Sequence, residues 1–268
     1  RMFGRRRDGT LAKVAPYRRM MPFLMRGRNE SVVYFEQRLD LKKATTWIET
    51  RNTRTGQRAT MFHLVLYALA RVLYERPHLN RFIAGKRIFD RRGVFLTFAA
   101  KKAFRDDAPL ATVKRGFAKD ESFDAMVAAL TTDIKVAKSD AISKVDKELG
   151  FFLKLPGFIL SPAVSLLRWL DARGLAPKAL IGDDPMYTSA FVANLGSLGI
   201  DAAYHHLYEY GNCPLFVTVG RIDAQTHEVV IKYSYDERVE DGFYAATALG
   251  LLRTWIEDPE SWIDAARS

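Results

Sequence analysis

The hydrophobic pattern of the first part of the chain changes from the period of a strand to that of a helix. Residues 31–41 alternate apolar and polar positions, which predicts a half-buried strand. Residues 59–77 instead repeat apolar positions every three or four residues, and this predicts a helix that ends before Pro77. The apolar stripe of that helix consists of Met61, Leu64, Val65, Leu69, Val72 and Leu73.

The middle of the chain continues with two strands and a helix. Segments 92–104 and 108–117 predict strands joined by the turn-forming sequence RDDAP. Residues 120–147 follow with a polar, Ala-rich amphipathic pattern that predicts a helix. No internal repeat and no low-complexity segment is visible in the sequence.

The last third has the most regular pattern. Residues 188–200 predict a strand broken by a Gly-containing turn, residues 214–222 a buried strand and residues 228–237 an alternating strand. A helix follows, and Asp241 stands where its N-cap belongs. The predicted stripe of this helix includes Phe243, Leu252, Trp255 and Ile256. For 268 residues with 48% apolar content, the pattern predicts a single α/β domain.

Residues 150–170 form the most apolar segment of the chain. Lys154, Pro156, Pro162 and Arg168 interrupt it, so that no span of about 20 apolar residues remains for a transmembrane helix. The pattern favours a pair of short helices that cover a core or a neighbouring subunit. A lid over an acyl channel and a contact with a membrane surface stay open as alternatives.

The charge of +10 is concentrated in one place. Residues 1–30 hold nine Arg or Lys against Asp8 and Glu30, so they supply +7. We expect this basic arm to be solvated or docked on a neighbouring subunit, rather than bound to a phosphorylated cofactor and least of all to nucleic acid. A single cysteine, Cys213, excludes a disulfide within one chain, and no secretory signal is visible; the expectation is a cytoplasmic protein.

Four short motifs resemble, in order, those of one enzyme family. They are RPHLNRFI (76–83), FVANLGSLGI (191–200), CPLFVTVGRI (213–222) and SYDERVEDG (234–242). Together they resemble the catalytic domain of the acyltransferase component of 2-oxo acid dehydrogenase complexes, a relative of chloramphenicol acetyltransferase. The resemblance divides the chain into the arm at 1–30 and one acyltransferase-like domain at 31–268, in which 148–187 looks like an apolar helical insertion.

The resemblance implies a chloramphenicol acetyltransferase-like fold, a mixed β-sheet flanked by helices. It also implies a homotrimer or a higher multiple with active sites between subunits. There a His takes the proton of a thiol of coenzyme A or a dihydrolipoyl group, which attacks a thioester, and a Ser stabilises the oxyanion. Glu237 stands at the place of that His, and Ala193 at the place of that Ser. Glu237 is either a functional group there or a structural partner for a basic residue of the neighbouring subunit, such as an Arg of the arm. Coenzyme A or acyl-CoA is therefore the substrate that the resemblance implies; no residue is assigned to bind it, and no metal is expected.

Both differences weaken the expected chemistry. Transfer of a proton from a free thiol to a free Glu side chain runs uphill by about 5 to 6 kcal/mol, although burial of the carboxyl reduces this barrier. Loss of one oxyanion donor adds about 2.7 to 4 kcal/mol. His205 and His206 lie in a connection about four residues longer than the family's, and one of them is a candidate to reach the place of the missing His; the alternative is a structural role for both.

The remaining polar residues have structural interpretations. Asp236 and Arg238 predict an ion pair that holds the turn, Asp241 a helix cap near the reacting centre, and Glu240 a solvated side chain. Asn194 is expected to bond across its turn or to contact the acyl donor, and Cys213 to be a small buried thiol rather than an acyl carrier. Structural roles are also expected for His63, His78 and His227.

Two hypotheses of function follow. The first is a divergent CoA-dependent acyltransferase without a lipoyl domain, in which Glu237, His205 or His206 acts as the base. The second is a trimeric scaffold or binding protein that keeps the fold and has lost the reaction. They differ in whether a thioester turns over and whether Glu237 matters to it.

Overall fold

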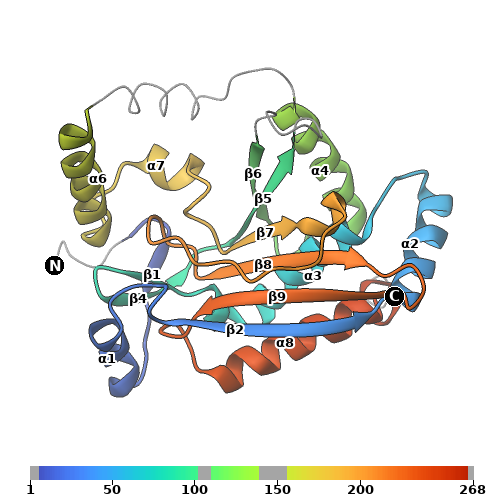
Figure 1. The fold of residues 1–268 in the computed structure, drawn as a ribbon, viewed down its shortest axis with the longest axis horizontal. Coiled ribbons are helices and arrows are strands. Elements are labelled where there is room, and N and C mark those ends of the chain that lie inside the picture. Colours follow the sequence, from blue (N-terminus) through green and yellow to red (C-terminus); the bar gives the residue numbers. More distant parts are fainter. Residues whose placement is uncertain (1–5, 102–109, 139–155, 265–268) are drawn as a thin grey trace.

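A six-stranded mixed sheet forms the centre of the protein (Figure 1). The computed structural model describes residues 6–101, 110–138 and 156–264. The strands lie in the order β2-β9-β8-β7-β5-β6, with β7 parallel to both β5 and β8 and the other pairs antiparallel. Their bounds are β2 (Val32–Asp40), β5 (Val94–Lys101), β6 (Leu110–Phe117), β7 (Ala190–Asn194), β8 (Leu215–Ile222) and β9 (Glu228–Asp236). All the predicted strands are confirmed, and the predicted turn at 105–109 lies outside the described residues.

Four helices build the main core with the sheet. They are α2 (Lys42–Thr55), α3 (Met61–Glu75), α4 (Phe123–Lys138) and α8 (Gly242–Glu257). Helix α3 packs on β5 and α8, and α8 also packs on β2. The predicted stripe of α3 is buried at Leu64, Leu69 and Leu73, and each such side chain contributes about 1.5 to 3 kcal/mol by leaving water. Helix α4 confirms the start of the helix predicted at 120–147, whose end lies outside the described residues.

The face of α8 that enters the core differs from the predicted stripe at one position. Leu252 and Ile256 are buried as expected, whereas Phe243 is 84% exposed. Residues 243 and 252 are nine positions apart, which on a helix of about 3.6 residues per turn places them on opposite faces. The prediction for Phe243 is therefore wrong, because the buried face continues through Ala245, Ala248 and Leu249.

The basic arm is part of the fold of its own chain. Strand β1 (Gly9–Leu11) pairs with β4 (Arg87–Arg91), which pairs with β3 (Phe82–Ala84) in a second, small sheet. Helix α1 (Pro16–Leu24) packs on β4. Three arginines of the arm, Arg6, Arg18 and Arg28, are buried. A solvated arm was therefore a wrong expectation for these three side chains, because acids and carbonyls of this chain bind them.

The apolar segment folds as one helix, α6 (Gly157–Ala172), that continues through Pro162; the predicted pair of short helices is wrong over these residues, and 150–155 lie outside the described part of the chain. A further short helix, α7 (Lys178–Asp183), follows. The end of α6 is held by polar contacts. Arg6 pairs with Asp171 at 2.7 Å, and Arg87 donates to the carbonyl of Ala172 at 3.2 Å.

The apolar side chains of α6 are largely uncovered within the chain. Phe158 is 78% exposed and Trp169 is 48% exposed, so α6 does not cover the core of its own chain. Whether α6 covers a neighbouring subunit stays a prediction. Among the described residues, no helix is long and apolar enough to cross a membrane.

The second face of the sheet carries a smaller apolar cluster of Phe191, Leu207, Cys213 and Phe216. The connection between η2 (Leu195–Leu198) and β8 supplies Leu207 and Cys213, so this long connection lies over the sheet. Tyr34 and Tyr204 meet edge to face at 5.2 Å and are both about half exposed. Part of this face is therefore open in a single chain.

Candidate functional site

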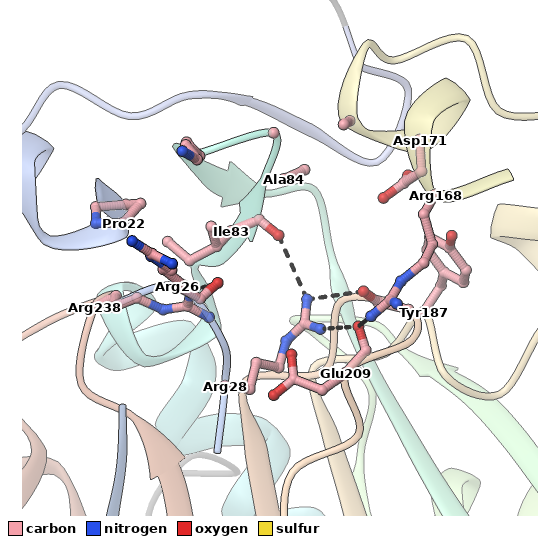
Figure 2. A pocket seen from close by; sticks show the side chains of 14 residues that line it. Pro22, Arg26, Arg28, Ile83, Ala84, Arg168, Asp171, Tyr187, Glu209 and Arg238 are labelled. Carbon is pink, nitrogen blue, oxygen red and sulfur yellow. Dashed lines mark hydrogen bonds between the residues drawn. The ribbon is translucent and has the colours of Figure 1, made fainter. Parts of the chain in front are cut away.

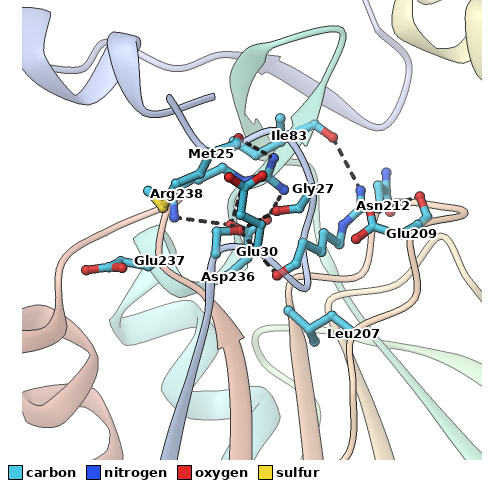
Figure 3. Close-up of polar contacts among 12 residues, drawn as sticks. Met25, Gly27, Glu30, Ile83, Leu207, Glu209, Asn212, Asp236, Glu237 and Arg238 are labelled. Atoms are coloured by element: carbon cyan, nitrogen blue, oxygen red, sulfur yellow. Dashed lines mark hydrogen bonds and ion pairs between the residues drawn. The ribbon is translucent and has the colours of Figure 1, made fainter. Parts of the chain in front are cut away.

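The corner between β9 and α8 is fixed first by a buried ion pair. Arg238 Nη2 lies 2.7 Å from Asp236 Oδ2, and both side chains are almost fully buried. Ser31 donates its hydroxyl to Asp236, and Arg238 also donates to the carbonyls of Met25 and Arg26 (Figure 3). The predicted pair is confirmed, and it ties the corner to the end of the basic arm.

Glu240 is the second buried acid of the corner, and the expectation that it is solvated is wrong. Its side chain lies 3.1 Å from Arg18, 3.0 Å from Arg81 and 2.8 Å from His78 Nδ1. The residue is only 9% exposed because these groups, from α1 and from the turn η1 (Pro77–Asn80) and its following residue, enclose it. Desolvation and the charge of Arg81 lower the pKa of His78, which favours its neutral form beside the carboxylate.

Glu237 lies between these two buried acids and is exposed. Both backbone polar groups of Glu237 are hydrogen-bonded. Its N–H donates to the carbonyl of Ser31 at 3.0 Å, and its carbonyl accepts from the guanidinium of Arg18 at 3.3 Å. Its carboxylate has no hydrogen bond or ion pair within the described residues, and Figure 3 shows it directed away from the buried network. The corner thus holds the backbone of Glu237 firmly and leaves its carboxylate available.

Asp241 caps α8 as predicted. Its Oδ1 accepts from the backbone N–H of Tyr244 at 2.9 Å, and its Oδ2 lies 3.6 Å from Arg18. The side chain stays 54% exposed. Asp241 is therefore a second carboxylate at the surface of the corner, four positions after Glu237.

Ala193 and Asn194 lie near the opposite end of the sheet. Ala193 pairs with Thr218, which pairs with Lys232, and Lys232 precedes Glu237 by five positions along β9. At about 3.4 Å per residue, this separates the two places by about 17 Å. The side chain of Asn194 accepts the N–H of Ser197 at 3.2 Å, which confirms its bond across the turn. One chain does not bring the places of the family's His and Ser together.

Within one chain, the two adjacent histidines lie away from Glu237. The ring of His205 stacks on Phe216 at a centroid distance of 3.8 Å, and its Nδ1 lies 2.7 Å from the carbonyl oxygen of His206. Phe216 pairs with Ser234, which precedes Glu237 by three positions, or about 10 Å along the strand. Burial lowers the pKa of His205, as expected for a packed, neutral ring. His206 is exposed and stacks on His205.

The other candidate residues have structural surroundings. Cys213 is buried, its thiol bonds to the carbonyl of Leu215, and burial raises its pKa, which is unfavourable for an acyl carrier. His63 forms a capping box with Thr60 at the start of α3, and His227 adopts a positive φ of 58° beside the start of β9. Within the described residues, no group of His, Cys, Asp or Glu side chains has the arrangement of a metal site.

Comparison with known proteins identifies the fold. No protein-family model and no curated protein sequence matches this chain. Many solved structures match, among them three that each cover 93% of this chain. A dihydrolipoamide acetyltransferase from Azotobacter vinelandii, studied for the roles of a Ser, a His and an Asn in its catalytic mechanism, has a TM-score of 0.59 and 17% identity over 93% of its own chain. A truncated catalytic core of the 2-oxoacid dehydrogenase multienzyme complex from Thermoplasma acidophilum has a TM-score of 0.60 and 14% identity over 98% of its chain. A chloramphenicol acetyltransferase has a TM-score of 0.55 and 14% identity, also over 98%.

The predicted chloramphenicol acetyltransferase-like fold is therefore confirmed. At these identities the likeness establishes the fold alone, so the roles of Glu237, Asp241, Asn194, His205 and His206 stay predictions. The sequence did not reveal the partners of Glu240. A hint was present, because four acids at one corner and many cations in the arm favour ion pairs if the corner is buried.

We expect Glu240→Gln and Glu237→Gln to differ sharply in their effect on stability. Glu240→Gln removes the more buried of the two acids that pair with Arg18 and with Arg81, which keep Asp241 at 3.6 Å and Asp90 at 2.7 Å. This is expected to lower the free energy of unfolding by about 1 to 3 kcal/mol. Glu237→Gln changes an exposed, unpaired carboxylate and should stay within about 0.5 kcal/mol. Urea unfolding measures both, and equal losses would contradict the assignment of Glu237 as the available acid.

The stacked His205 also predicts a pH dependence of stability. Because its pKa is lowered in the folded protein, the unfolded chain takes up a proton below about pH 6.5 that the folded chain does not. Stability is therefore lost as the pH falls below that value, and His205→Gln should lose less between about pH 7.5 and 5 than the parent. Urea unfolding at the two pH values tests this, with His227→Gln in the turn before β9 as the control. Equal losses for the parent and His205→Gln would show that the stacked ring does not resist protonation.

Proposed function

We propose that this protein transfers an acyl group from a CoA thioester to an acceptor thiol, with Glu237 as the proton acceptor. The observation that carries the proposal is that the acids of the corner differ in burial and in whether their carboxylates are paired. Asp236 and Glu240 are buried against cations, whereas Glu237 is fixed through its backbone and keeps a free carboxylate. A residue that is fixed through its backbone, and whose carboxylate is unpaired, is suited to accept a proton from a bound ligand.

The expected reaction exchanges one thioester for another. The acceptor thiol gives its proton to Glu237, and its sulfur bonds to the carbonyl carbon of the donor. The tetrahedral intermediate then collapses, the bond from carbon to the donor sulfur breaks, and that sulfur takes the proton from Glu237. Asp241 follows Glu237 by four positions, the same spacing as between the His and the Asn studied in the Azotobacter enzyme. We assign Asp241 a place beside the reacting groups on this basis.

The geometry of the sheet supports a site built from two copies of the chain. Glu237 and Asn194 belong to opposite ends of the same sheet, so they can act on one thioester only if neighbouring chains bring different ends together. One solved structure with this fold is the cubic core of the pyruvate dehydrogenase multienzyme complex, an assembly. We therefore propose a homotrimer, or a multiple of it, in which Glu237 of one copy faces Asn194 of the next.

A silent scaffold with the same fold is the second candidate, and one observation favours it. Ala193 offers no hydroxyl to an oxyanion, and His205 is stacked on Phe216 instead of replacing the missing imidazole. A carboxylate alone is a weaker base toward a thiol than a His would be. In this case coenzyme A binds without turnover, or does not bind.

Single-turnover and steady-state assays separate the two candidates. With acetyl-CoA and a panel of small thiols, Glu237→Gln should lower kcat/KM by about 10²- to 10⁴-fold, because a positioned base contributes this much. Ala193→Ser should raise the rate, by up to about 10²- to 10³-fold if the hydroxyl reaches the oxyanion. Glu49→Gln, an exposed carboxylate on α2, is the matched control and should have no effect. Transfer at equal rates in the parent and Glu237→Gln would remove Glu237 from the mechanism, and no transfer in the parent would favour the scaffold.

A further inference from the structure

A basic pocket of about 180 Å³ lies beside the corner that presents Glu237 (Figure 2). Its walls come from the end of α1, the turn between β3 and β4, the end of α6 and the connection at 209–211. Its volume is several times the roughly 30 Å³ that one water occupies in the liquid, so a small polar group fits. The charged residues of its lining are Arg26, Arg28, Lys86, Arg168, Arg238, Asp171 and Glu209.

The lining has an excess of positive charge after its internal ion pairs are taken into account. Asp171 is bound by Arg6 at 2.7 Å, and Arg238 is bound by Asp236 at the same distance. Four cations, Arg26, Arg28, Lys86 and Arg168, then share the pocket with the single carboxylate of Glu209. That carboxylate is itself bonded to the backbone and side chain of Asn29. The pocket is therefore suited to an anion.

Arg28 is buried without an acidic partner. Its guanidinium donates to the carbonyls of Ile83, Glu209 and Gly211 at 3.5, 2.8 and 2.8 Å (Figure 2). It also donates to the carbonyl of Tyr208 at 3.1 Å, and it forms no ion pair with a carboxylate of the described residues. Burial lowers the pKa of Arg28, which reflects the cost of keeping this charge out of water. Neutral carbonyls satisfy its N–H groups, and Asp236 and Glu209 attract its charge only from beyond ion-pair distance. An anion in the pocket would balance the charge of Arg28.

The charged groups of the other three cations make few contacts with the rest of the chain. Lys86 adopts a φ of 59° after Gly85 at 54°, in a two-residue hairpin turn where Gly or Asn would be relaxed. Its ammonium lies 5.2 Å from the ring of Phe23 and has no ion pair within the described residues. The guanidinium of Arg26 has no partner there, and that of Arg168 donates only to the carbonyl of Glu209. A strained Lys with an unused charge points to a ligand.

We propose that this pocket binds the diphosphate group of the CoA donor. The assignment to CoA rests on the proposed function, whereas the phosphate chemistry rests on the charges of the lining alone. Arg238 lines the pocket and directly follows Glu237, so the pocket and the proposed base share one corner of the chain, and the pantetheine arm of the donor would lead from one to the other. Arg168 comes from α6, and this gives the apolar segment a role in completing the pocket.

Calorimetric titrations with three probes test the pocket on the full chain at low salt. The probes are CoA, inorganic pyrophosphate, and pantetheine, which keeps the thiol arm and lacks phosphate. The variants are Arg26→Gln and Lys86→Asn, with Arg221→Gln, an exposed Arg of β8, as the charge-matched control. Each pocket variant should weaken CoA and pyrophosphate by about 10-fold or more and leave pantetheine unchanged. Lys86→Asn should keep or raise the melting temperature, because Asn tolerates a positive φ; binding loss then cannot be ascribed to unfolding.

The outcomes separate the pocket from the acyltransferase proposal. If CoA binds equally to the parent and both pocket variants, the pocket assignment is overturned and the acyltransferase proposal stands. If pyrophosphate binds through Arg26 and Lys86 but CoA does not bind, the phosphate site stands and its assignment to CoA is overturned. If neither CoA nor pyrophosphate binds the parent, or if the control weakens both as much as the variants do, the site itself is overturned.

Discussion

The buried carboxylate of Glu240 is the constraint on which the arrangement of the corner depends. It collects Arg18 from the basic arm, Arg81 from the residues after α3 and the ring of His78. A charge buried in this way is stable only with its partners, and removing one side leaves the other uncompensated. The pair of Asp236 and Arg238 adds a second tie to the same arm. Between them, the backbone of Glu237 has little freedom while its side chain is left to solvent.

The same principle explains where the basic charge of the arm goes. Arg6 holds the end of α6 through Asp171, Arg18 holds the corner through Glu240, and Arg28 binds the carbonyls of the connection before β8. The arm thus joins three segments that are far apart in sequence. The polar attachment of α6 also explains how a helix with exposed apolar side chains is placed without entering the core.

The regular elements of this fold could be predicted from the sequence, because period-two and period-3.6 patterns are local. The strand at β2 and the stripe of α3 are examples. Phe243 shows a limit of that approach, since a helix with apolar residues on several faces does not reveal which face is buried. The candidate site was harder to predict from the sequence. Arg81 meets Glu240 across 159 positions, and the basic pocket is assembled from six separate segments, so no local spacing in the sequence predicts either.

The proposed acyltransferase site requires two copies of the chain. Within one chain, Asn194 pairs with Val219, which pairs with Ile231, six positions before Glu237. Positions 194 and 237 are therefore about 20 Å apart along the strands, too far for a disulfide or a short thiol cross-linker to join them. The direct measurement uses Asn194→Cys and Glu237→Cys together with Cys213→Ala, treated with a short bis-maleimide and separated under denaturing conditions. A site shared between neighbouring copies predicts covalent dimers and trimers that disappear when either introduced cysteine is omitted. Products that remain the size of one chain, from protein that is assembled in solution, would contradict it.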